Sequence, residues 1–140
     1  MPWTNLNQPT TLEKAVGGLC YLTFGLAGLL YIILGGRRDQ SDFFRFHFLQ
    51  SILLGIIGLI LGWTSGIFVT LATGILATLA NFIPSISQEL VAQIGSGVGL
   101  GLGYIMNAGL LVLLYGMIFA FLGKYAEIPL ISNIVRQQMR

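Results

Sequence analysis

Charge is the first thing this sequence lacks. Only 9% of its 140 residues are charged, whereas soluble domains carry roughly 25%. Between Arg45 and Lys124 the one charged residue is Glu89, which we expect in a loop or in the first turn of a helix. A stretch this long and this uncharged excludes an ordinary soluble core. It is typical of a chain that crosses or lies in a lipid bilayer.

Cysteine and histidine are almost absent as well. Cys20 is the single cysteine, which excludes an intrachain disulfide and a multi-cysteine metal site, so we expect a small buried apolar residue. His47 is the single histidine. A role as ligand to a metal or pigment is one hypothesis for it, and a hydrogen-bonding role is the more common alternative.

These absences also bear on function. No Ser/His/Asp set and no pair of acids inside an apolar segment is present, so we expect no enzyme. The net charge of +2 and the lack of a dense basic patch argue against nucleic-acid binding. No cofactor and no metal are predicted, while a bound lipid or pigment is left open.

Apolar sequence is what the chain has in abundance, since 55% of its residues are hydrophobic. We predict an all-α, polytopic integral membrane protein with a single transmembrane domain over 1–140. Thr10 and Glu13 fit a capping box before the first apolar run. Counting about 20 residues for each crossing gives three strong transmembrane helices, near 15–35, 44–63 and 100–122.

The borders of these spans follow from local signals. Ser41 or Asp42 can cap the second helix, and Trp63 is expected where that helix leaves the bilayer. The glycine tract 95–103 favours a bend before the last span. The segment 66–95 is ambiguous, because it can lie along the membrane surface or form a fourth span after a hairpin near 62–66.

Basic residues flank the apolar middle and suggest an orientation. An even number of crossings between Arg45 and Lys124 places six of the seven Lys and Arg residues on one face. The positive-inside rule favours that arrangement and makes this face cytoplasmic or stromal. The tail 128–140 has apolar residues at helical spacing, which predicts an amphipathic helix on the membrane surface. A frayed polar tail is the alternative.

Glycine is unusually frequent, with 19 residues, and several recur at spacings of four or seven. Such spacing places small residues on one face of a helix, where another backbone can approach closely. Packing within the monomer, self-association and docking to a partner all use such a face. The candidate helix-packing glycines are Gly58, Gly62, Gly66, Gly95, Gly99, Gly103, Gly109 and Gly116.

Two stretches resemble one known family. The first motif covers 37–50 and runs from a basic loop into an aromatic helix start; the second covers 123–132. Both occur in this order in the twenty-kilodalton Tic family, which comprises a chloroplast inner-envelope protein-import component and cyanobacterial relatives. The residues that carry the resemblance, and are candidates for interaction, are Arg37, Arg38, Phe44, Arg45, Phe46, His47, Gln50, Gly123, Tyr125, Glu127 and Pro129.

The resemblance implies an all-helical membrane protein, usually of four spans, with both motifs on one membrane face. It implies a role in protein translocation or membrane-protein biogenesis, in a cyanobacterial plasma or thylakoid membrane or a plastid inner envelope. The expected partners are the lipid bilayer and other membrane-protein subunits. The alternative is a small accessory or assembly subunit of a larger, for example photosynthetic, complex. A solute channel is less well supported, because few polar residues are available to line one.

Overall fold

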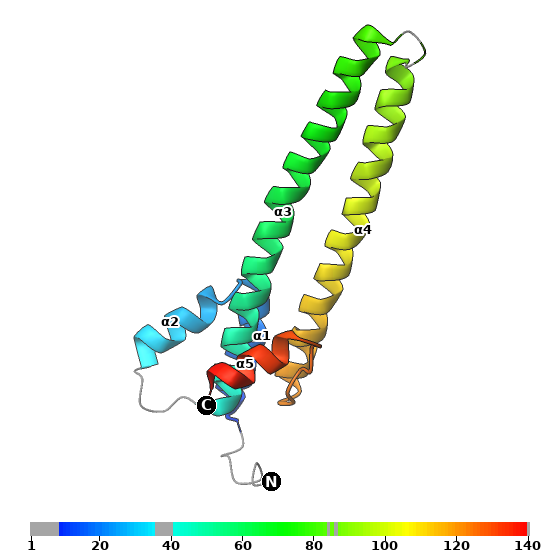
Figure 1. Ribbon diagram of the computed structural model, residues 1–140. Coiled ribbons are helices and arrows are strands. Elements are labelled where there is room, and N and C mark those ends of the chain that lie inside the picture. The colour runs from blue at the N-terminus through cyan, green and yellow to red at the C-terminus, as the bar shows by residue number, and fades with distance from the viewer. Residues whose placement is uncertain (1–8, 36–40, 84, 86, 140) are drawn as a thin grey trace. The chain divides into compact units, whose positions relative to one another are not determined.

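The computed structural model describes residues 9–35, 41–83, 85 and 87–139, and within these residues every regular element is an α-helix (Figure 1). Arg37 and Arg38 lie outside the described residues, as does Arg140. The all-α prediction is confirmed for the described part of the chain. Its helices are α1 (Thr11–Leu22), α2 (Leu26–Gly35), α3 (Asp42–Phe82), α4 (Gln88–Phe121) and α5 (Ile131–Gln138).

The start of α1 is the predicted capping box. The Thr10 hydroxyl accepts a hydrogen bond from the backbone N–H of Glu13, and the Glu13 carboxylate accepts one from the backbone N–H of Thr10. Two of the N–H groups that a helix start leaves without partners are thereby satisfied.

The single span predicted over 15–35 is wrong, because the helix breaks after Leu22. Phe24 and Gly25 adopt φ values of 52° and 91°, in the left-handed region that does not continue an α-helix. A side chain on Gly25 would meet Ile52, so glycine lets the chain pass close to α3. Thr23 bridges the break by donating to the Leu19 carbonyl and accepting from the Ala27 N–H.

Trp63, where the second span was predicted to leave the bilayer, does not end a helix. Helix α3 starts near the predicted residue, with the Ser41 hydroxyl capping the N–H of Phe44, but it continues for 41 residues to Phe82. Thr64 and Ser65 donate back to carbonyls of their own helix, so they do not cap a new one. At 1.5 Å per residue α3 is about 60 Å long, roughly twice the hydrocarbon thickness of a bilayer.

Helix α4 contains the second half of the ambiguous segment 66–95 and the glycine tract where a bend was predicted. The second half of the ambiguous segment is helical from Gln88, and the helix runs without a break through the glycine tract to Phe121. Ser87 caps the N–H of Leu90, so Glu89 lies in the first turn, as one of the two expectations had it. The helix that holds the predicted last span therefore starts 12 residues before the predicted residue 100 and ends within one residue of the predicted end.

Helix α4 ends with a hydrogen-bond pattern that depends on glycine. Gly123 has φ 70°, its N–H donates to the Ala120 carbonyl, and the Lys124 N–H donates to the Phe119 carbonyl. This is a Schellman motif, in which a left-handed residue closes the last helical turn. The chain then turns back as an extended stretch and enters α5.

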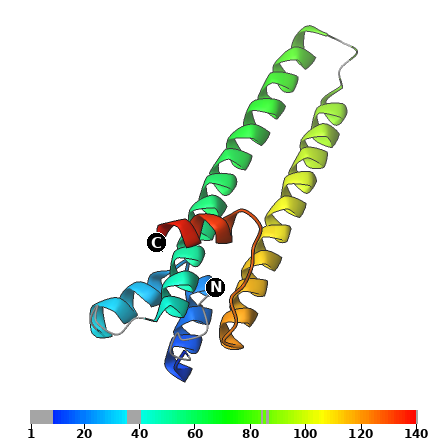
Figure 2. The same ribbon diagram turned by 60° about the horizontal axis from the view of Figure 1, so that its bottom comes forward.

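The chain divides into two compact units. Unit 1 holds residues 1–57 and 110–140, and unit 2 holds 58–109. Within unit 2, the helical stretches 58–82 and 88–109 run side by side, with Thr73 of one against Gly95 of the other. Within unit 1, α5 lies across the first turns of α3 in both views (Figure 2). Most of the buried side chains, including Cys20, belong to unit 1.

Among the described residues, two helices, and not the predicted three, are long and apolar enough to cross a membrane: α3 and α4. In the most apolar 18 consecutive residues of each helix, only 6% of the residues of α3 and 11% of those of α4 are buried. These stretches are therefore not the core of a soluble protein. Large apolar side chains such as Trp63, Phe82 and Leu111 lie on the surface of the chain. A lipid bilayer is the environment that suits such a surface.

Candidate functional site

Residues of the two motifs meet in unit 1, although about 75 positions separate them in the sequence. His47 and Gln50 of α3 bond to the backbone of Lys124 and Ala126, directly after α4. We call residues 124–139 the C-terminal segment. Tyr21 of α1 joins the same group of side chains, so three parts of the chain converge on one buried polar cluster, made of Tyr21, His47, Gln50 and Ser132.

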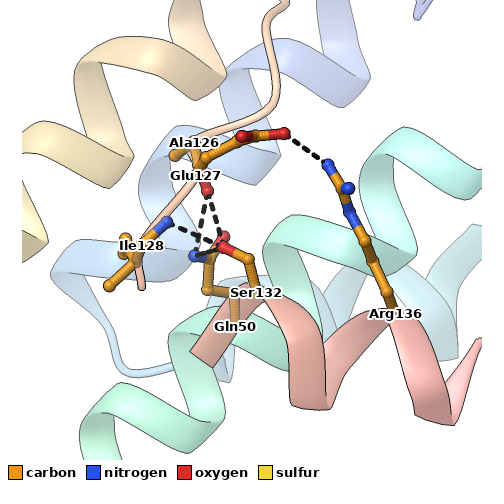
Figure 3. A network of polar contacts seen from close by, with 6 residues as sticks. All are labelled: Gln50, Ala126, Glu127, Ile128, Ser132 and Arg136. Atoms are coloured by element: carbon orange, nitrogen blue, oxygen red, sulfur yellow. Dashed lines mark hydrogen bonds and ion pairs between the residues drawn. The ribbon is translucent and has the colours of Figure 1, made fainter. Parts of the chain in front are cut away.

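Gln50 and Ser132 form the part of the cluster shown in Figure 3. The Gln50 side-chain amide donates to the Ala126 carbonyl at 3.1 Å and to the Ser132 hydroxyl at 3.3 Å. The Ser132 hydroxyl donates to the Ala126 carbonyl at 3.2 Å and accepts from the Ile128 N–H at 2.7 Å. Both side chains are buried. Loss of Ser132 would leave the Ile128 N–H without this acceptor, whereas loss of Gln50 would leave Ser132 and the Ala126 carbonyl bonded to each other.

The hydrogens of the cluster can be assigned from its carbonyls. His47 Nε2 lies 3.1 Å from the Lys124 carbonyl, so a neutral ring carries its hydrogen there and Nδ1 is an acceptor. The Tyr21 hydroxyl lies 2.9 Å from both His47 Nδ1 and Gln50 Oε1. One hydroxyl hydrogen therefore serves two acceptors. Both imidazole nitrogens therefore have hydrogen-bond partners, as the hydrogen-bonding alternative for His47 expects.

Aromatic rings enclose His47. The ring centroids of Phe43 and Phe46 lie 4.5 Å and 5.4 Å from that of His47, and the Tyr125 ring stacks on it at 6.2 Å. These rings exclude water from the imidazole, which is fully buried. The aromatic residues of both motifs thus shield the hydrogen bonds between the motifs.

Phe44, Arg45, Glu127 and Pro129 were predicted alongside these residues but do not belong to the cluster. Phe44 is buried against Tyr31 of α2, with 4.9 Å between ring centroids. Arg45 is exposed and 3.9 Å from Asp42, while Glu127 is exposed and pairs with Arg136 at 2.6 Å. Pro129 is exposed as well. The structure therefore joins only part of the predicted motif residues into one site.

Glu13 ties the start of α1 to the start of α3. One carboxylate oxygen accepts from the Ser41 N–H at 3.1 Å, and the other belongs to the capping box. Burial raises the pKa of this carboxyl, but the hydrogen bonds from Ser41 and Thr10 outweigh it, so the pKa lies below its ordinary value. Glu13 is therefore ionised, although it is only 4% exposed.

Lys14 lies against the end of α4. A side chain on Gly123 would come within 2.6 Å of Lys14 Cε and 3.1 Å of Nζ. The ammonium group is thus close to the carbonyl end of a long helix, where a positive charge is stabilised. Adjacent residues of α1 hold the beginning of α3 and the end of α4 at one end of unit 1.

The predicted glycine faces are only partly packed. A Cβ on Gly116 would come within 2.4 Å of the Tyr21 ring, one on Gly95 within 2.7 Å of Thr73, and one on Gly62 would barely touch Met106. The other predicted glycines would meet nothing within 4 Å: Gly58, Gly66, Gly99, Gly103 and Gly109. Other glycines, which the spacing did not single out, are closely packed: a Cβ on Gly18, Gly28 or Gly55 would come within 3 Å of a side chain, and one on Gly17 would make ordinary contact with His47 at 3.6 Å.

The sequence analysis missed Tyr21 and Ser132. Tyr21 lies in an apolar run with no polar neighbour. The pattern that could have identified it is its spacing of four and eight residues from Gly17 and Glu13, which places all three on one face of α1. Ser132 was noted only as the end of the second motif. The feature that could have identified Ser132 is its position four residues after Ile128, because a serine side chain there can accept a hydrogen bond from the Ile128 N–H.

Polar side chains of unit 2 do not line a path. The hydroxyls of Thr64, Ser65, Thr70, Thr73 and Thr78 donate to carbonyls of their own helix, and Asn107 does the same. A shallow hollow of about 450 Å³ on α3 is lined mainly by apolar atoms of residues between Thr70 and Leu79. Among the described residues, no group of three His, Cys, Asp or Glu side chains could hold a metal ion.

Comparison with known proteins gives one relative. The chain is 27% identical over 126 residues to the UPF0132 membrane protein MJ1527 of Methanocaldococcus jannaschii, a match that covers 89% of this chain and 68% of that protein. No protein-family model matches the chain. No solved structure matches it. The similarity to a membrane protein agrees with the two apolar helices, and nothing in these comparisons points to the Tic family.

Proposed function

We propose that this protein is a non-enzymatic membrane subunit that assembles with other membrane proteins. The observation that carries the proposal is the contrast between the two units. Unit 1 buries a polar cluster that holds its helix ends together. Unit 2 has apolar faces on which most of the predicted glycines contact nothing in the described part of the chain. Exposed small residues on a membrane helix favour close approach of another helix.

A role in protein translocation or membrane-protein biogenesis is the second candidate. It is favoured by the meeting of the two motifs, whose resemblance to the twenty-kilodalton Tic family implies that role. A pore formed by this chain alone is not part of the proposal. The hydroxyls that could line it are bonded to their own helix backbone.

The proposal is tested by solubilising native membranes in a mild detergent and separating complexes on a native gel. We expect the protein to migrate in constant ratio with one larger complex, whose subunits mass spectrometry identifies. Crosslinks to chains in transit would favour the translocation role. Migration alone, together with ion conductance of the purified protein in planar bilayers, would contradict the assembly role.

A pair of matched variants makes the test specific. Gly103→Leu fills the α4 face that also carries Gly99, and we expect it to abolish migration with the larger complex. Gly97→Leu places the same bulk on the opposite side of the same helix, and we expect it to be silent. Neither glycine has a neighbour within 4 Å in the chain, so both variants should fold.

A further inference from the structure

The turn before α5 has a geometry that its sequence does not favour. Leu130 has φ 69° and ψ −51°, and the Ile131 N–H donates to the Pro129 carbonyl at 2.9 Å. This is a γ-turn with a positive central φ, the rarer and more strained of its two forms. A bulky apolar residue is an outlier at such a φ, which glycine or asparagine adopts more readily.

Hydrogen bonds on both sides of the turn hold it in place. The Ser132 N–H donates to the Ile128 carbonyl, and the Ser132 side chain bonds to the Ile128 N–H and the Ala126 carbonyl. Glu127 and Arg136 form an ion pair at 2.6 Å that links the stretch before the turn to α5. The strain is therefore maintained by contacts within the chain.

Leu130 gains no packing in return. Its side chain is 78% exposed, and Ile134, one helical turn later on the same side, is 47% exposed. Helix α5 already buries its other apolar flank, since Val135 is only 2% exposed. Leu130 and Ile134 thus form an apolar edge, which nothing in the described part of unit 1 covers.

The orientation of α5 indicates what the edge faces. Figures 1 and 2 both show α5 lying across the first turns of α3. Because α3 is apolar enough to cross a membrane, a helix that lies across it runs along the membrane surface. Exposed Lys124 and Arg136 belong to the same segment, and their long side chains can reach lipid headgroups while apolar neighbours lie deeper.

We propose that Leu130 and Ile134 insert into the lipid interface and that this edge of the C-terminal segment is a membrane contact. The strained turn serves to aim Leu130 at the lipid. The proposal requires that α3 crosses the membrane, but it does not require the assembly role, so the two can fail separately. A protein that migrates alone on native gels can still have this lipid contact.

Site-directed spin labels measure the contact directly. Single cysteines at 130, 133 and 134 are introduced into a Cys20→Ala background, and the labelled full-length protein is reconstituted into phosphatidylcholine vesicles. We expect nitroxides at 130 and 134 to collide with oxygen in the lipid, and the one at 133, about 100° around the helix from 134, to collide with a nickel reagent in water. Water accessibility at all three positions would overturn the proposal, and so would shielding of 130 and 134 from both reagents.

A substitution tests the same point without a label. Leu130→Asn suits the positive φ, so we expect thermal stability in detergent to be kept or raised. In vesicles, the same variant should lose the protection of the C-terminal segment against protease. Asn133→Leu, on the wet side of α5, is the control and should leave protection unchanged. A loss of stability in detergent for Leu130→Asn would mean that Leu130 serves the protein interior, which contradicts the proposal.

Discussion

Gly116 shows how single residues decide the packing of unit 1. The Tyr21 ring lies where a Cβ on Gly116 would be, with 2.4 Å to its nearest atom, and hydrogen bonds to His47 and Gln50 hold the ring there. The ring cannot move aside without breaking those bonds. The polar cluster therefore requires a glycine at position 116.

We therefore expect Gly116→Ala to destabilise the protein by about 1–3 kcal/mol, the usual cost of overpacking a close contact. Gly109→Ala, seven residues earlier on α4, meets nothing within 4 Å and should be neutral or stabilising, because alanine favours a helix. Thermal unfolding of both variants in one detergent measures the difference. Equal stability of the two variants would show that the contact with Tyr21 is absent.

Glu13 makes a prediction about pH. Hydrogen bonds lower the pKa of this carboxyl in the folded protein, so its ionisation contributes stability above the ordinary pKa of 4.5. That contribution is lost as the pH falls from 4.5 through the lower pKa of the folded state. Glu13→Gln should lower stability at neutral pH and weaken this acid-dependent loss.

Thermal unfolding between about pH 3 and 7 checks the prediction, given the carboxyl pKa range. Glu89→Gln is the matched control, because it removes one carboxylate from an exposed helix start. If Glu13→Gln and Glu89→Gln change the pH dependence of thermal stability equally, the hydrogen bonds of Glu13 do not stabilise the folded protein.

Among the elements, the C-terminal segment depends most clearly on a few side chains. Gln50→Leu removes three hydrogen bonds, to the Ala126 carbonyl, the Ser132 hydroxyl and the Tyr21 hydroxyl, each worth about 0.5–1.5 kcal/mol net. We expect amide hydrogen exchange of residues 124–139 to accelerate. The exchange of α4 should change less, because its helix hydrogen bonds do not involve Gln50.

Hydrogen exchange read by mass spectrometry checks this, with Gln137→Leu as control. Gln137 is an exposed glutamine of α5, so its loss should leave exchange of the segment as in the wild type. Unchanged exchange in Gln50→Leu would mean that apolar contacts alone dock the segment.

The same elements show how far the sequence predicts the fold. Thr10, Ser41 and Gly123 act locally, through caps and a left-handed turn, and the helix ends that they define were predicted. The break at Thr23 was not, because Phe24 is a poor residue for a positive φ and the close approach of Gly25 to Ile52 is a tertiary contact. The length of α3 was not predicted either, because an interfacial residue type such as Trp63 does not end a helix.

Only part of the candidate site could be predicted from the sequence. His47, Gln50 and Tyr125 were singled out by the motif resemblance, but nothing local pairs Gln50 with Ala126 or Tyr21 with His47. Those contacts join residues that are 76 and 26 positions apart. Spacing along one helix predicts a shared face but not the partner, which is why Gly17 and Gly55 were missed.

For the whole molecule, the central claim is that both motifs lie together at one end of unit 1, and so on one membrane face. Residues on α3 and in the C-terminal segment should then be close in the native membrane. Arg45 is exposed a little over one turn before Gln50, and Asn133 is exposed next to Ser132. These two positions can be changed without touching the polar cluster.

The most direct test places cysteines at these two positions in a Cys20→Ala background and treats sealed native membranes with a short bifunctional maleimide. The account predicts an intramolecular crosslink, together with labelling of both cysteines from the same side by an impermeant reagent. Labelling of position 45 and position 133 from opposite sides, with no crosslink, would contradict it.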